Sequence, residues 1–309
     1  MQPDFNKTNQ EIEEIDLLEL FNALWNKKIL IIIFTFLFAI LSVIYSLSLP
    51  NIYNSTATLI SAEPDDSLSS QIGKYSSFAS LAGIQIPDNS NKAQEAIERT
   101  KSYDFFVNHF LPYIKKEDLF AQSNWDINQN KLSYNINLYD EENKLWTRKV
   151  SKPFLPEPSN QELFKVYLNA YSIAQDKKTN FIHVSFEHIS PYIAQEWLVL
   201  IINNINNYMK KLDQVSAQKS IDYLEKSFSD TKIAEIRVSM TSLWNEQLQI
   251  LMMTDSNDDY IFKTISSPLV PEIKSKPNRK IICIFGTFLG FILGLIFALF
   301  SYYIHKKKD

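Results

Sequence analysis

The sequence predicts an α+β protein in which two transmembrane helices flank one large polar domain. That domain should have a small mixed α/β base near the membrane and a long protruding helical hairpin. Two observations lead to this fold class. Residues 29–49 and 281–304 are uncharged apolar runs, each long enough to cross a bilayer as a helix. Between them, a segment of mixed strand-like and helix-like patterns is followed by a long helical pattern without glycine.

The charges that flank the two apolar runs predict how the chain crosses the membrane. Lysines lie at 27–28, before the first run, and at 306–308, after the second. Because cytoplasmic flanks are rich in Lys and Arg, we expect residues 1–28 and 305–309 to be cytoplasmic tails and the middle to be translocated. Four basic residues within 274–280 oppose this rule, but long domains cross largely regardless of charge. A cleaved signal peptide is the alternative for the first run, which is too long and follows an acidic tail.

The stretch before the first run has its own helical pattern. Between Thr8 and Trp25, apolar residues recur at intervals of three and four, which predicts a short amphipathic helix. This helix would either lie at the membrane interface or extend the first span.

Residues 50–189 are expected to form the base. β-Branched and aromatic residues or alternating patterns predict strands, and other segments have helical spacing. We expect strands at 52–60, 130–139, 170–174 and 180–187, and helices at 92–110 and 161–168. The three prolines between 151 and 160 predict a connector.

Residues 190–253 are expected to form the helical hairpin. Apolar residues follow an alternating three-four spacing that is typical of a coiled-coil seam, at Leu198, Ile201, Ile205 and Leu212. One unbroken helix would extend about 90 Å, and the following loop is too short to bring the chain back. We therefore expect a turn near 227–230 and a returning strand at 259–266 that joins the strand at 52–60. Neighbouring copies in a homo-oligomer should cover the seam.

Residues 254–280 lead back to the membrane as the return strand and a stiff connector. Proline at positions 268, 271 and 277 favours an extended backbone, so Pro268, Pro271 and Pro277 are candidate connector residues. In the second span, glycines recur every fourth residue, at Gly286, Gly290 and Gly294. This spacing allows another helix to approach closely. The partner would be the first span of the same chain or a span of a neighbouring copy.

The sequence lacks the motifs of several function classes. It has no P-loop, no nucleophile elbow and no set of residues that would complete a zinc site, so we expect no catalytic, cofactor-binding or metal-binding residues. The net charge of −4 disfavours a nucleic-acid partner. The single cysteine, Cys283, excludes an intramolecular disulfide.

The order of these features resembles that of the Wzz-type chain-length determinants, the polysaccharide co-polymerases of bacterial inner membranes. The stretch before the first span, EIDLLELFNALWNKKILI, is similar to the family's, as is the short SLAGI motif at 80–84. The most specific similarity lies in YLEKSFSDTKIAEIR, in DDYIFKTISSPLVPEIKSKPNRK and in the glycine-rich span that follows.

The resemblance implies a non-enzymatic protein of the inner membrane with a periplasmic domain. Its partners would be sister copies in a ring-like homo-oligomer, a Wzy-type polymerase, a lipid-linked glycan and membrane lipids. The protein would set the modal chain length of that glycan, commonly lipopolysaccharide O antigen, without a cofactor.

Two other functions are compatible with the same topology. The first is a two-span membrane sensor or receptor, which is disfavoured because only about five residues follow the second span. The second is a capsule-export co-polymerase that works with a separate tyrosine kinase. The missing P-loop excludes only a kinase fused to this chain.

Overall fold

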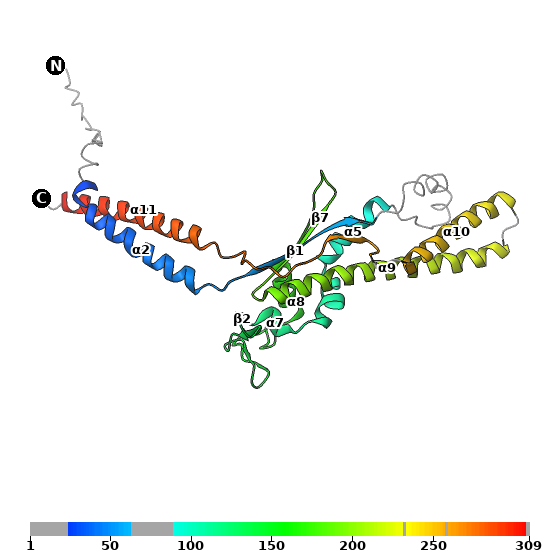
Figure 1. Ribbon diagram of the computed structural model, residues 1–309, viewed down its shortest axis with the longest axis horizontal. Coiled ribbons are helices and arrows are strands. Elements are labelled where there is room, and N and C mark those ends of the chain that lie inside the picture. Colours follow the sequence, from blue (N-terminus) through cyan, green and yellow to red (C-terminus); the bar gives the residue numbers. More distant parts are fainter. Residues whose placement is uncertain (1–23, 63–88, 231–232, 257–258, 307–309) are drawn as a thin grey trace, which may run out of the picture. The chain divides into compact units, whose positions relative to one another are not determined.

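The computed structural model describes residues 24–62, 89–230, 233–256 and 259–306 (Figure 1). The chain divides into two compact units, one made of residues 1–50 and 277–309 and the other of residues 51–276. The expected amphipathic helix lies almost wholly outside the described residues, and the SLAGI motif lies entirely outside them. The predicted α+β fold class is confirmed.

In the part of the first unit that the structure describes, the two long helices are α2 (Lys28–Ser48) and α11 (Arg279–Lys306). Both are long and apolar enough to cross a membrane, and they correspond to the two predicted spans. Helix α2 ends where Leu49 turns to an extended backbone, one residue before Pro50. The two helices pack against each other, and most of their large side chains face outward.

The second unit is built on a four-stranded antiparallel sheet with the strand order β6-β7-β1-β8. Its strands are β1 (Tyr53–Ser61), β6 (Tyr171–Gln175), β7 (Ile182–His188) and β8 (Phe262–Ser266). Strand β1 pairs with β7 through Ala57 and Val184, and with β8 through Ser61 and Phe262. The predicted return strand therefore joins the sheet beside the first strand, as expected.

Helices cover the sheet and form an aromatic core with it. The core combines α5 (Asn89–Thr100), α6 (Tyr103–Phe105), a π-helical turn (Phe106–Phe110), α8 (Asn160–Ala170) and the first half of α9. Phe110 contacts Tyr167, Phe186 and Trp197, so one buried ring joins three elements.

The single helix expected at 92–110 is wrong, because the chain breaks after Thr100. Ser102 has an extended backbone and its hydroxyl accepts a hydrogen bond from the N–H of Phe105. Ser102 thus acts as a cap that starts a new helix.

Residues 111–146 add short elements to the side of the base. They are a 3₁₀ turn (Leu111–Tyr113), α7 (Lys116–Phe120) and the strand pairs β2 (Gln122–Asp126)–β3 (Lys131–Tyr134) and β4 (Tyr139–Asp140)–β5 (Leu145–Trp146). The strand expected at 130–139 is only partly correct. It stops at Tyr134 because the side chain of Asn135 accepts the N–H of Asn137 and turns the chain.

The hairpin consists of α9 (Pro191–Asp230) and α10 (Ala234–Ser256), which lie side by side (Figure 1). At 1.5 Å per residue, their lengths are about 60 Å and about 35 Å. The predicted turn position agrees with the end of α9. Leu224 of α9 packs against Met240 and Leu243 of α10, and this small cluster is separate from the main core.

Candidate functional site

The three glycines of α11 lie against α2 of the same chain. A Cβ atom added to Gly290 would lie 2.5 Å from Cβ of Phe38, and one added to Gly294 would lie 3.1 Å from Cα of Ile31. At Gly286, an added Cβ would collide with Ser42. A side chain at any of these positions would force the two helices apart. Of the two partners considered, the structure shows the span of the same chain, and the functional role of this row stays a prediction.

The proline-rich connector is held against the base by its carbonyl groups. The hydroxyl of Ser55 in β1 donates to the carbonyl of Leu269 at 2.8 Å, and Nε2 of Gln195 in α9 donates to the carbonyl of Pro268 at 3.0 Å. Prolines free neighbouring carbonyls from regular pairing, so side chains of the base take their place. Pro268 is buried, whereas Pro271 and Pro277 are half-buried.

The two chain segments that lead to α2 and α11 are tied to each other. The N–H of Ile52 donates to the carbonyl of Lys276 at 2.9 Å, and the N–H of Ser275 donates to the carbonyl of Ile52 at 2.8 Å. Nζ of Lys274 donates to Oδ1 of Asn51 at 3.1 Å. We call this region, residues 51–52 and 274–276, the neck. The two segments of the base that continue into the predicted spans are therefore cross-linked to each other.

The predicted oligomer seam requires a correction. Leu198, Ile201 and Ile205 are 0–1% exposed and belong to the core of this chain, and Leu212 packs against its edge. The first half of α9 contacts β1 and β7, so the apolar stripe faces the sheet. Leu198, Ile201 and Ile205 are therefore covered within the chain and unavailable to a neighbouring copy, and Leu212 is half-buried.

Another apolar stripe on the hairpin is open to solvent. Trp244, Leu248 and Met252 follow one another at intervals of four on α10 and are 36%, 38% and 65% exposed. Residues four apart lie on the same side of a helix, so the three form a continuous row. The buried face of α10, with Met240 and Leu243, points toward α9 instead. We call the exposed row the α10 stripe.

A single amide fastens the return strand to the long helix. Oδ1 of Asn206 in α9 accepts the N–H groups of Ile261 and Phe262 at 3.0 and 2.9 Å, and its Nδ2 donates to the carbonyl of Phe262 at 3.0 Å. All of these groups are buried. About two helical turns farther along, Asp213 accepts hydrogen bonds from Lys92 at 2.8 Å and from the hydroxyl of Tyr260 at 2.6 Å.

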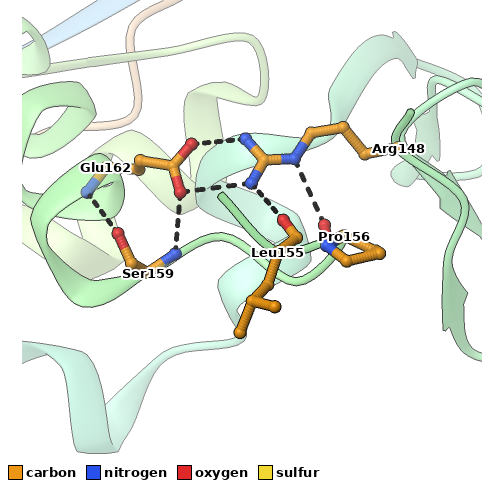
Figure 2. A network of polar contacts seen from close by, with 5 residues as sticks. All are labelled: Arg148, Leu155, Pro156, Ser159 and Glu162. Atoms are coloured by element: carbon orange, nitrogen blue, oxygen red, sulfur yellow. Dashed lines mark hydrogen bonds and ion pairs between the residues drawn. The ribbon is translucent and has the colours of Figure 1, made fainter. Parts of the chain in front are cut away.

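Arg148 organises the loop before α8 (Figure 2). Its guanidinium makes a bidentate pair with Glu162, at 2.5 and 3.1 Å, and donates to the carbonyls of Leu155 and Pro156. Glu162 also accepts the N–H of Ser159, which completes a capping box at the start of α8. The hydrogen bonds from Arg148 lower the pKa of Glu162 to about 2.

A buried histidine joins β7 to α7. Nε2 of His188 lies 2.9 Å from the carbonyl of Asp118, and its Nδ1 accepts the N–H of Ser190 at 2.9 Å. The ring packs edge-on against Trp197, with 4.9 Å between the ring centroids. Burial lowers the pKa of His188 to about 4, so the ring is neutral at pH 7.

Sequence reasoning did not single out Asn206, Arg148 or His188 for these roles. Each of the three has a partner that lies 14 to 70 residues away in the chain, so no local spacing marks that contact. The exception is the Ser159–Glu162 spacing, a capping-box signal that is readable in the sequence. Across the described part of the chain, no group of three or more His, Cys, Asp or Glu side chains could hold a metal ion.

Comparison with known proteins finds similarity to one family of membrane proteins. Residues 13–108 match the family model described as chain length determinant protein, Wzz, which is the family that the sequence resembles. A full-length bacterial polysaccharide co-polymerase is 15% identical, with 94% of this chain and 99% of that chain covered and a TM-score of 0.42. A fragment of WzzB, a polysaccharide co-polymerase from Salmonella Typhimurium, is also 15% identical, with 73% and 99% covered and a TM-score of 0.32. No curated protein sequence matches.

Proposed function

We propose that the chain is a member of the Wzz chain length determinant family, whose model residues 13–108 match, and that it sets the length of a lipid-linked surface polysaccharide. Members of this family are non-enzymatic regulators. The polysaccharide would be lipopolysaccharide O antigen, extended by a separate Wzy-type polymerase. The family match is the observation that carries this proposal.

The arrangement of the chain supports such a role. Two candidate membrane helices flank a soluble domain, and family members reside in the inner membrane. Both termini would be cytoplasmic and the domain periplasmic, on the side where the glycan is assembled. The domains we propose are a base at 50–189, a hairpin at 190–253, a return strand and connector at 254–280, and spans at 29–49 and 281–304.

Co-polymerases of this family are oligomeric, and we assign the contact between copies to the α10 stripe. Three large apolar side chains in a row on one helix are costly to leave in water. A second copy would bury them, and repetition of this contact around an axis would form a ring. The ring would present many identical surfaces to the polymerase or to the growing polymer.

The regulatory role is tested by deleting the gene and analysing the glycan as a ladder of chain lengths. We expect polymer to persist with a broad length distribution, and the wild-type gene supplied in trans should restore the narrow one. A ladder that is identical with and without the gene would contradict the proposed function.

The oligomer surface is tested separately by replacing Leu248 and Met252 with glutamate. The purified double variant should have a smaller mass in detergent than the wild-type protein, because charges on the α10 stripe oppose association. Ser216→Glu places a similar charge on an exposed position of α9 and should leave the mass unchanged. An unchanged mass in the double variant would exclude the α10 stripe as the contact.

A further inference from the structure

The connector that leads to α11 exposes two large apolar side chains. Leu269 and Ile273 are 71% and 82% exposed, which makes Ile273 the most exposed large apolar residue in the described part of the chain. Both belong to the segment between β8 and α11. Their side chains do not join the core of the base.

The backbone that carries these side chains is fixed to the base. The carbonyl of Leu269 is held by the hydroxyl of Ser55, and the amide of Ser275 and the carbonyl of Lys276 are held by Ile52 in the neck. Pro271 restricts the chain between these points. Leu269 and Ile273 are therefore held on an ordered segment, residues 269–276, which we call the strap.

The strap is connected directly to the second predicted span. Ile273 lies six residues before Arg279, where α11 begins, so the chain can separate the two by about 20 Å at most. Basic residues accompany the apolar ones, at positions 274, 276, 279 and 280, and no acidic residue occurs between 273 and 308. Lys276 also pairs with Glu187 at 2.7 Å, and 58% of its side chain remains exposed.

Aromatic residues gather at the same end of the base. The ring of Tyr53, which follows Ile52 of the neck, contacts the ring of Trp125 at 5.6 Å, and Trp125 contacts Tyr192 at 6.1 Å. Ile127, in the turn after β2, is 71% exposed. Trp and Tyr beside apolar and basic side chains are typical of a membrane–water interface.

From these observations we propose that the strap, residues 269–276, is a membrane-surface contact. Leu269 and Ile273 enter the boundary between headgroups and acyl chains, and Lys274 and Lys276 face anionic phospholipid headgroups. This contact fixes the base on the bilayer at the point where the chain enters α11. The proposal rests on α11 crossing the membrane and does not depend on which glycan the protein regulates.

The test uses the full-length protein in lipid nanodiscs. Cys283→Ser removes the single cysteine, and Ile273→Cys or Leu269→Cys then carries a nitroxide label. Paramagnetic relaxation by oxygen, which concentrates in lipid, is compared with relaxation by a water-soluble nickel chelate. Val238→Cys is the control, because Val238 is 65% exposed on α10.

We expect the oxygen-to-nickel ratio to be several-fold higher at 273 and at 269 than at 238. The ratio at 273 should also be higher in nanodiscs with anionic lipid than in purely zwitterionic ones. Equal ratios at the strap and at 238 would overturn the proposal. Low accessibility to both reagents at 273 and 269 would overturn it as well, because it would indicate contact with protein. A ratio that does not depend on lipid charge would overturn the role assigned to the lysines.

Discussion

Replacing Asn206 with alanine should loosen β8 without unfolding the rest of the base. The side chain of Asn206 is 3% exposed and satisfies three backbone groups at the start of β8, the two amides of Ile261 and Phe262 and the carbonyl of Phe262. Strand β8 lies at the edge of the sheet and is five residues long, so its ladder with β1 is short. The strand therefore depends on this amide more than an interior strand would.

The expected magnitude follows from the buried groups that lose a partner. A buried donor or acceptor left unsatisfied costs about 1–3 kcal/mol, and partial access of water reduces the sum. Because the two amides share one oxygen, we expect local opening of β8 to become easier by about 2–4 kcal/mol. With one factor of ten for each 1.4 kcal/mol, amide exchange should accelerate about thirtyfold to several hundredfold.

Hydrogen exchange measured by mass spectrometry on peptides that cover residues 259–267 gives the exchange rate of the β8 amides directly. Asn207→Ala is the matched control, because Asn207 is the next residue of α9 and is exposed. Peptides from β7 should exchange equally in both variants and in the wild type. If the peptides of β8 exchanged within threefold of the wild-type rate in Asn206→Ala, the role assigned to this amide would be refuted.

Three further predictions concern other contacts. Because the folded pKa of His188 is lowered to about 4, below its ordinary 6.5, stability should fall by about 3 kcal/mol as the pH drops from 6.5 to 4, measured as chemical unfolding in detergent. Gly290→Leu should push Phe38 outward and cost about 1–3 kcal/mol of helix packing, read as a larger distance between spin labels on α2 and α11 and as a broader glycan ladder. Arg148→Ala should cost about 3 kcal/mol, since it leaves Glu162 without its partner, and it should raise the pKa of that carboxyl, measured by NMR titration.

Each of these three predictions has a control variant or an outcome that would contradict it. In His188→Gln the loss of stability between pH 6.5 and 4 should shrink, and an unchanged pH profile would assign the acid sensitivity to other groups. Leu289→Phe adds bulk at a 50% exposed position of α11 and should leave the label distances unchanged. The packing role of Gly290 would be rejected if Gly290→Leu behaved like Leu289→Phe. Arg148→Lys keeps the charge but loses the bidentate geometry, so it should restore only part of the stability.

The sequence predicted those features that depend on chain length and on long apolar patterns. The two spans follow from runs that exceed the thickness of a bilayer, and the hairpin follows from the reach of the chain after residue 253. The return of β8 to β1 was predictable from the reach of the chain as well, because the segment after residue 253 has to lead back to the membrane. The pair of strands β6 and β7 also followed from local alternation and a polar turn, because a half-buried hairpin requires both.

The polar contacts of the base could not be predicted in this way. Asn206 reaches a strand 55 residues away, and His188 reaches a carbonyl 70 residues away. A polar residue in a helix or strand pattern looks the same whether it faces water or a buried backbone group. Only the three-dimensional arrangement distinguishes these cases, and for Arg148 the sole local signal was the capping box of its partner Glu162.

The misassigned seam shows how one spacing can serve two different environments along a single helix. In α9, Leu198, Ile201 and Ile205 face the sheet, whereas Leu224 faces α10. Periodicity reveals that one side of a helix is apolar, but it does not reveal which partner covers that side. Once the partners within the chain are assigned, the apolar side chains that remain exposed are the informative ones. Of the exposed apolar side chains of α10, Trp244, Leu248 and Met252 form a continuous row, and this outer stripe of the short helix, in place of the inner stripe of the long one, is the surface proposed for the contact between copies.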